Sequence, residues 1–157
     1  MKTASLKEIK TELNRVHSSR LLELCIQLAK YKKENKELLT YLLFDSYDEK
    51  AYILEVKTHM DELFMEANRN NAYHAKKSIR KILGIVNKQI KYSGSKQTEV
   101  ELLIHFCKNL RKSGFTLPLN SALDSIYWRQ IQKINKSLAT LHEDLQFDYS
   151  EEIRLLS

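Results

Sequence analysis

The scarcity of glycine and proline is the feature that most restricts how this chain can fold. The 157 residues include three glycines and one proline, the two residue types that most strongly end helices and shape turns. Apolar residues recur at the three- and four-residue spacing of amphipathic helices, and no stretch alternates as a strand does. The sequence therefore predicts an all-α protein.

The helical periodicity predicts about seven helices followed by a short terminal one. Ser/Thr-x-x-Asp/Glu patterns, in which both side chains satisfy free backbone N–H groups, mark helix starts at Ser5, Ser46, Thr98 and Ser121. A loop is expected at residues 115–120, because Pro118 prevents a helix there. The predicted helices span residues 5–16, 20–33, 35–45, 48–69, 72–92, 98–112, 121–146 and 149–156.

We expect these helices to pack as a single domain over residues 1–157. The short connections favour an irregular bundle or a short array of antiparallel helical hairpins, and a compact HEAT-like α-solenoid is the alternative. Residues 21–44, read as two short helices broken near Glu34 and Asn35, include an almost solidly apolar segment. A helix that is apolar on all sides must be covered by neighbours, so this stretch is predicted to form the centre of the core.

The cellular location is predicted from the cysteines and from the absence of targeting patterns. Cys25 and Cys107 each fall on an apolar helix face, which suits buried, reduced thiols. The N-terminal sequence MKTASLKEIK lacks the apolar region of a secretory signal. No window approaches the roughly 18 charge-free apolar residues of a membrane span. We therefore expect a cytoplasmic protein that does not bind membranes.

Three segments carry a resemblance to a known family: LAKYKKENKELLTYLLF, KKSIRKILGIVNKQIKYSG and KQTEVELLIHFC. With them, nearly the whole chain resembles a family of uncharacterised bacterial proteins of about this length. The resemblance implies a compact helical domain. It implies no catalytic motif and no established activity.

The predicted helix at 72–92 carries the strongest functional signal. Residues 71–114 hold ten Lys/Arg against two Asp/Glu, in a chain of net charge +6. No carboxylate lies between Ala72 and Gln97, although like charges one turn apart oppose a helix by a few tenths of a kcal/mol. The basic residues occupy the arc opposite the apolar one, with Gly84 near its middle. They are Lys76, Lys77, Arg80, Lys81, Lys88 and Lys91.

Three explanations of this basic arc remain open at the level of the sequence. The cations are solvated or paired within the fold, for example with the acidic residues between 143 and 152; they bind an acidic protein surface; or they bind nucleic-acid phosphates. None of the recognised motifs of nucleic-acid-binding modules is present. Gly84 is either a point of close approach by a ligand or backbone, or a tolerated mid-helix glycine.

Tyr127, Trp128 and Arg129 form the second candidate site. Tyr127 belongs to the apolar stripe of its helix, whereas Trp128 points roughly 100° away. With Phe147 and Tyr149 they are predicted to form an aromatic interaction patch; alternatively Trp128 packs under the loop or the last helix. Between residues 127 and 145 the stripe approaches heptad spacing, which suits a homodimer through the helix at 121–146.

No pattern predicts catalysis, a metal site or a cofactor. Glu101 and His105 lie one turn apart, but the inward Glu-x-x-His motif of metal-binding bundles is absent. So are the Gly-x-Ser-x-Gly nucleophile motif and a phosphate-binding glycine loop. We therefore predict a non-enzymatic interaction module that binds an acidic partner surface through the basic arc. Sequence-nonspecific nucleic-acid binding by the same arc is the alternative.

Overall fold

The computed structural model describes residues 2–115, 118 and 121–156. Within them it contains eight α-helices, one π-helical turn and no strand, which confirms the all-α prediction. The chain divides into two compact units, residues 1–44 and 45–157. That the two fold as a single domain over residues 1–157 stays a prediction.

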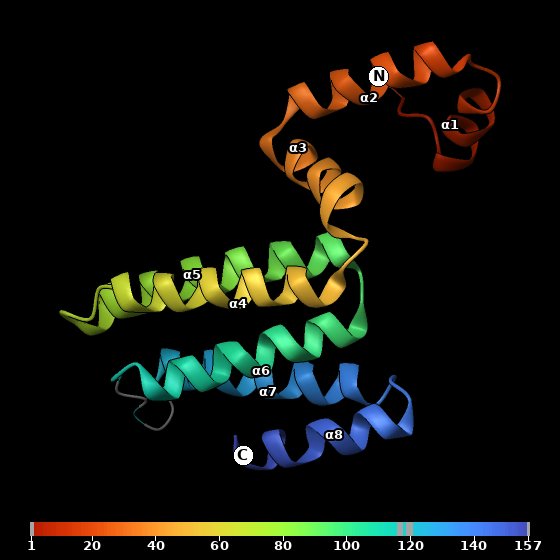
Figure 1. The fold of residues 1–157 in the computed structure, drawn as a ribbon. Helices are drawn as coiled ribbons and strands as arrows, with labels where there is room; N and C mark the ends of the chain where they lie inside the picture. Colours follow the sequence, from red (N-terminus) through yellow and green to blue (C-terminus); the bar gives the residue numbers. More distant parts are fainter. Residues whose placement is uncertain (1, 116–117, 119–120, 157) are drawn as a thin grey trace. The chain divides into compact units, whose positions relative to one another are not determined.

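The first unit consists of three short helices (Figure 1), namely α1 (Leu6–Leu13), α2 (Ser18–Tyr31) and α3 (Lys33–Thr40), which continues into the π-helical turn η1 (Tyr41–Asp45). The capping box predicted at Ser5 and Glu8 is present, because each side chain accepts a hydrogen bond from the other residue's backbone N–H. α2 ends before Lys32, whose backbone is extended. The Asn35 amide then donates to the Leu28 carbonyl oxygen at 2.8 Å and ties α3 to α2.

The prediction that residues 21–44 form the centre of the core is wrong. α1, α2 and α3 contain no buried residue, and Leu22, Leu28 and Phe44 are 64%, 60% and 72% exposed. Three short helices enclose too little volume to cover all sides of an apolar helix, so they cover only part of each apolar face. Cys25, which was expected to be buried, is exposed for the same reason.

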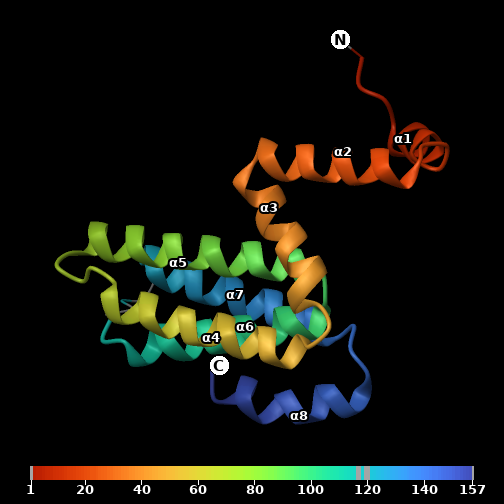
Figure 2. The ribbon, with the colours of Figure 1, turned by 45° about the horizontal axis from the view of Figure 1, so that its top comes forward.

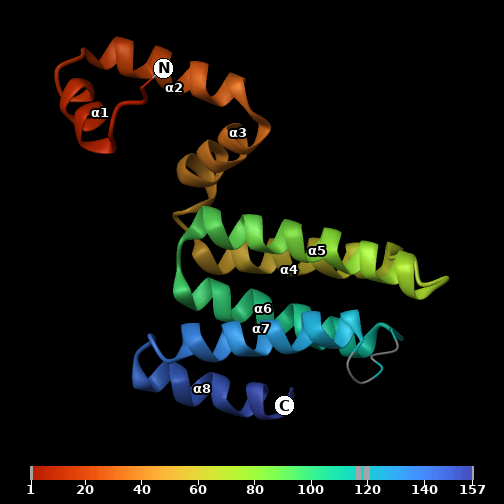
Figure 3. The same ribbon diagram turned by 180° about the vertical axis from the view of Figure 1, so that it is seen from behind.

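The second unit is built from two antiparallel hairpins and a final helix, as Figures 1, 2 and 3 show. The hairpin of α4 (Glu49–Glu66) and α5 (Ala72–Ser93) packs on the hairpin of α6 (Lys96–Lys112) and α7 (Ala122–Leu138). The last helix, α8 (Glu143–Arg154), lies on the far side of the second hairpin. Short connections thus produce sequential antiparallel hairpins, as predicted.

α6 lies at the centre of this second unit. It contacts α4, α5 and α7 and contains nine buried residues, more than any other helix that the structure describes. Phe106 is fully buried, and its ring lies 5.5 Å from that of Phe64 on α4. Cys107 is buried, as predicted. Burial of each such large side chain contributes about 1.5–3 kcal/mol to folding.

Two helix starts differ from the predicted ones because the hydroxyl and carboxylate groups have other partners. α6 begins at Lys96 instead of residue 98, with the Ser95 hydroxyl accepting from the Thr98 N–H at 3.3 Å. Thr98 is fully buried and donates its hydroxyl to Glu49. α4 is capped by Asp48, whose carboxylate accepts from the Ala51 N–H. The Ser121 cap of α7 is present as predicted.

The long helix predicted at 121–146 is two helices. α7 ends at Leu138, where tight turns bring the N–H groups of Thr140 and Leu141 to carbonyls three residues earlier. α8 then begins at Glu143, capped by His142 and with two acidic residues in its first turn. Acidic side chains are favoured there by the helix dipole. The predicted loop at 115–120 lies largely outside the described residues.

The buried carboxylate of Glu99 joins α6 to α7. It is 5% exposed and accepts a hydrogen bond from the Ser137 hydroxyl at 2.7 Å, while Lys96 and Lys133 approach it at 2.7 and 3.0 Å. Burial alone would raise the pKa of Glu99, but these three donors outweigh it and lower the pKa from 4.5 to about 2. The buried charge is therefore compensated within the fold.

Replacing Glu99 by Gln is expected to destabilise the protein by about 2 kcal/mol near pH 7, because charged hydrogen bonds are lost in a buried position. Since the folded-state pKa of about 2 lies below the ordinary 4.5, the stabilisation by Glu99 is fully present above pH 4.5 and is lost as pH falls toward 2. Urea unfolding across this pH range should therefore show a smaller decrease in the free energy of unfolding for E99Q than for the wild type. The exposed Glu66→Gln is the control; equal effects of the two substitutions would contradict this account.

Candidate functional site

The basic arc predicted on the fifth helix lies on the outer side of α5. This helix spans Ala72–Ser93, and the Asn71 side chain caps it by accepting from the His74 N–H. Its buried side chains, including Ile79, Ile82 and Val86, face the core. We call the opposite surface the α5 basic face. It comprises the exposed Lys77, Arg80, Lys81 and Lys91 and the half-buried Lys76 and Lys88.

The cations of this face differ from the four lysines of the second unit that pair with carboxylates of α6 and α8. Among the residues that the structure describes, no carboxylate forms an ion pair with Lys76, Lys77, Arg80, Lys81 or Lys91; Lys88 does have an interaction of its own. Four lysines elsewhere in the unit each lie within 3.0 Å of a carboxylate on another turn or helix. They are Lys57 with Glu101, Lys96 and Lys133 with Glu99, and Lys108 with Glu152.

Three of the acidic residues of α8 have partners other than the α5 basic face. Glu151 pairs with Arg154, Glu152 with Lys108 and Asp144 with His142. α8 also lies on the opposite side of the α6–α7 hairpin from α5 (Figure 1). One explanation open from the sequence was that the α5 basic face pairs with the acidic residues between 143 and 152. These three carboxylates do not pair with it.

α7 extends the positive surface beyond α5. The two helices run parallel, because residues at the start of both line one pocket and the Lys133 ammonium group reaches the Asn87 amide oxygen at 2.9 Å. Arg129 and Lys136 lie about one helical turn before and after Lys133 on α7. Arg129 and Lys136 are both exposed. Figure 2 shows α7 beside α5.

Gly84 leaves the middle of this surface open. It is exposed, and a Cβ atom built on it would meet no atom within 4 Å. Close packing inside the described fold therefore does not explain the glycine. The fold does not require glycine here, and both approach by a ligand and a tolerated mid-helix glycine stay predictions.

The residues of the predicted aromatic patch lie in different surroundings. Tyr127 is buried, and its hydroxyl donates to the Leu156 carbonyl oxygen at 2.6 Å near the end of the chain. Trp128 is 43% exposed and packs edge-on against Tyr127, while Arg129 is exposed. Phe147 lies in the second turn of α8 and is 80% exposed. Tyr149 points to α6 instead, where its hydroxyl donates to Glu101 at 2.8 Å.

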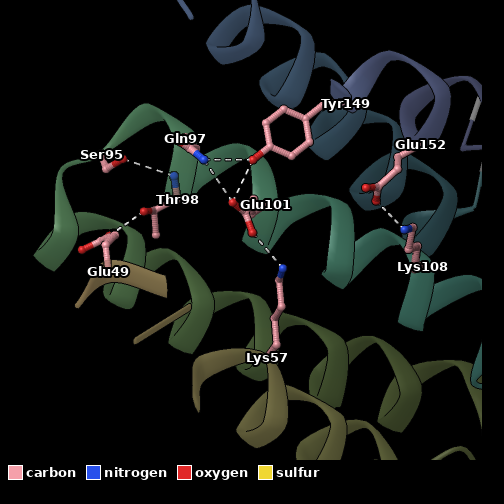
Figure 4. A network of polar contacts seen from close by, with 9 residues as sticks. All are labelled: Glu49, Lys57, Ser95, Gln97, Thr98, Glu101, Lys108, Tyr149 and Glu152. Carbon is pink, nitrogen blue, oxygen red and sulfur yellow. Dashed lines mark hydrogen bonds and ion pairs between the residues drawn. The ribbon is translucent and has the colours of Figure 1, made fainter. Parts of the chain in front are cut away.

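A polar cluster joins α4, α6 and α8 around Glu101 (Figure 4). The Glu101 carboxylate accepts from Lys57 at 2.9 Å, from Tyr149 at 2.8 Å and from Gln97 at 3.4 Å. Burial would raise its pKa, but the hydrogen bonds from Lys57 and Tyr149 outweigh this and lower it. Burial, and the hydrogen bond to Glu101, raise the pKa of Tyr149 to about 12.

The cluster continues along α6 and is best explained as structural. His105 lies 2.6 Å from Asp61 on α4, and Lys108 pairs with Glu152 on α8. The cavity beside this cluster is about 70 Å³, which is room for a few waters at most. The sequence revealed Glu101 and His105 only as neighbours on one helix, because Lys57, Asp61 and Tyr149 come from elements distant in the chain.

Comparisons with known proteins add no further information on this site. No protein-family model, curated protein or solved structure matches the chain. None of the described helices combines the length and the apolar character that crossing a membrane requires.

The two cysteines are expected to differ in reactivity. Cys25 is exposed, whereas Cys107 is buried and its burial raises its pKa to about 12. Because the thiolate is the nucleophile, we expect one thiol per chain to react with a disulfide reagent near pH 8 in dilute native protein, and two after unfolding. Cys25→Ser should abolish the native reaction. Two reactive thiols in the native protein would contradict the burial of Cys107.

Proposed function

We propose that this protein is a non-enzymatic interaction module that binds an acidic partner surface through the α5 basic face. The observation that supports it is the difference in pairing: lysines that face other helices of the second unit have carboxylate partners, while five cations on the outside of α5 have none among the described residues. Such a face repels itself at i,i+4 spacing, and an anionic partner relieves this repulsion.

The geometry of the face suits a partner that is extended along the helix. Lys77, Lys81 and Lys91 follow α5 over about 20 Å, and Arg129 and Lys136 add a second row on α7. A positive surface of this size raises the association rate with an acidic partner and makes it depend on ionic strength. Lysine and arginine stems also add apolar contact area while the charged ends stay hydrated.

Sequence-nonspecific nucleic-acid binding by the same face is the second candidate. The specific observation in its favour is the second row of cations on α7, since two rows separated by the open surface at Gly84 can contact phosphates along a strand. Tyr73, 69% exposed on the same helix, offers a ring on which a base can stack.

Self-association through residues 121–146 stays a prediction. Tyr127 and Ile134, which belong to the proposed dimer seam, are buried within the second unit. A homodimer through this segment would therefore use the outer side of α7, with Trp128 and Arg129, and not the heptad-like stripe.

A charge-matched pair of variants tests the proposal. Lys77→Glu/Arg80→Glu/Lys81→Glu reverses three exposed positions of the α5 basic face, and Lys10→Glu/Lys50→Glu/Lys112→Glu reverses three exposed lysines elsewhere. We expect the first variant to lose at least about tenfold in affinity for a polyglutamate probe, and the second to lose little, although both change the net charge equally. Calorimetry or fluorescence anisotropy measures the affinity.

Nucleic-acid probes in the same titration distinguish the two candidates. A duplex DNA or single-stranded RNA that binds more tightly than polyglutamate, with affinity falling steeply between about 50 and about 200 mM salt, would favour the second candidate. No binding of any anionic probe at the lower salt, or an equal loss in both variants, would contradict both.

A further inference from the structure

An apolar groove lies between α2 and α3, in the first unit. Its volume is about 250 Å³. The helices meet at the extended Lys32, and the hydrogen bond from Asn35 to the Leu28 carbonyl fixes their spacing. Besides Asn35, the groove is lined by Cys25, Leu28, Ala29, Leu38, Leu39 and Leu42.

The chemistry of this groove restricts what it can bind. No Lys, Arg, Asp or Glu lines it, and its one amide side chain already donates to a backbone carbonyl. A charged or strongly polar ligand would lose its hydration there without gaining a partner. The groove therefore fits an apolar helix face, which sets it apart from the α5 basic face.

The apolar area around the groove is large for a surface without a partner. Six large side chains in and beside it are between 36% and 64% exposed: Leu22, Ile26, Leu28, Leu38, Leu42 and Leu43. At on the order of 100 Å² each, they present roughly 600 Å² of apolar surface; a standard interface buries about 800 Å² per partner, of which little more than half is apolar.

We propose that the α2–α3 hairpin packs against the same hairpin of a second copy of this chain. Two hairpins with one apolar face each, related by a two-fold axis, form a four-helix bundle whose interface uses the same groove twice. The available apolar area meets the requirement of a stable dimer. Dimerisation also supplies the core that α1, α2 and α3 lack, because none of them contains a buried residue.

The full-length protein tests this by sedimentation equilibrium over roughly 5–200 µM, since the dimer fraction follows mass action. We expect the mass to rise toward twice 18.5 kDa with concentration. Leu28→Glu/Leu42→Glu, at positions 60% and 51% exposed, should remain monomeric with unchanged helix content. The matched control, Leu54→Glu/Met65→Glu, changes two side chains of α4 that are 65% and 72% exposed and should dimerise as the wild type does.

The thiol of Cys25 gives an independent readout, because it lines the groove while Cys107 is buried. Its alkylation should be at least about tenfold slower in the concentrated wild type than in the dilute wild type or in L28E/L42E, since covered thiols do not react. A wild type that stays monomeric at all concentrations would overturn the proposal. Fast alkylation would then indicate a groove open to another partner, and slow alkylation a groove covered within the chain.

The variants decide where an observed dimer forms. Persistence of the dimer in L28E/L42E, or its loss in L54E/M65E, would also overturn the proposal, because either result places the interface outside the α2–α3 groove. Since neither pair of positions belongs to the α5 basic face, failure here leaves the proposed anion binding unaffected, and the reverse also holds.

Discussion

The burial of α6 is the constraint on which the second unit depends. Its side chains contact α4, α5 and α7, so even its polar side chains lie at helix interfaces. Thr98 donates a hydrogen bond to Glu49 on α4, and Glu99 accepts from Ser137 and pairs with Lys133, both on α7. Glu101 accepts from Lys57 on α4 and from Tyr149 on α8. A buried carboxylate without such partners would cost several kcal/mol. Each of these polar contacts therefore fixes the position of a neighbouring helix as well as compensating a charge.

The same constraint explains why the cations of α5 remain outside. α5 packs on α6 through an isoleucine- and valine-rich face, and it carries no carboxylate of its own. The nearby carboxylates on α6 are occupied by Lys57, Lys96 and Lys133. The positive charge of the chain thus gathers on a surface for which the described part of the fold supplies little compensation, and this imbalance is the physical basis of the proposed interaction with an acidic partner.

The first unit shows a different imbalance, of apolar surface instead of charge. Its leucines are as numerous as those of a core, yet they belong to three short helices that cannot enclose them. The two units therefore expose surfaces of different character: cations on α5 in the second unit, and apolar side chains in the α2–α3 groove of the first. A dimer formed through the groove would carry two copies of the α5 basic face. Once an extended acidic partner has bound one copy, the other would be held at a high effective concentration, which strengthens the overall binding.

The sequence predicted what depends on local pattern and missed what depends on contacts distant in the chain. The span of α5 and its amphipathic division follow from helical periodicity, as do the Ser5 and Ser121 caps. The Thr98 hydroxyl was assigned to a cap because its partner, Glu49, lies 49 residues away. The high density of apolar residues at 21–44 also led to the wrong prediction of the core, because this density does not show which helix has neighbours on every side. The sequence of α6 is less apolar, since Glu99, Glu101 and His105 lie among its leucines.

Native-state hydrogen exchange of the full chain, in dilute solution, tests most directly whether α6 is the centre of the fold. Amides that exchange only by global unfolding are the slowest in a protein. We expect the slowest amides between Leu102 and Cys107, and exchange in α2, between Leu21 and Leu28, faster by at least about a hundredfold, which is about 2.7 kcal/mol of opening free energy. Equal protection of α2 and α6 would contradict the account and return residues 21–44 to the core.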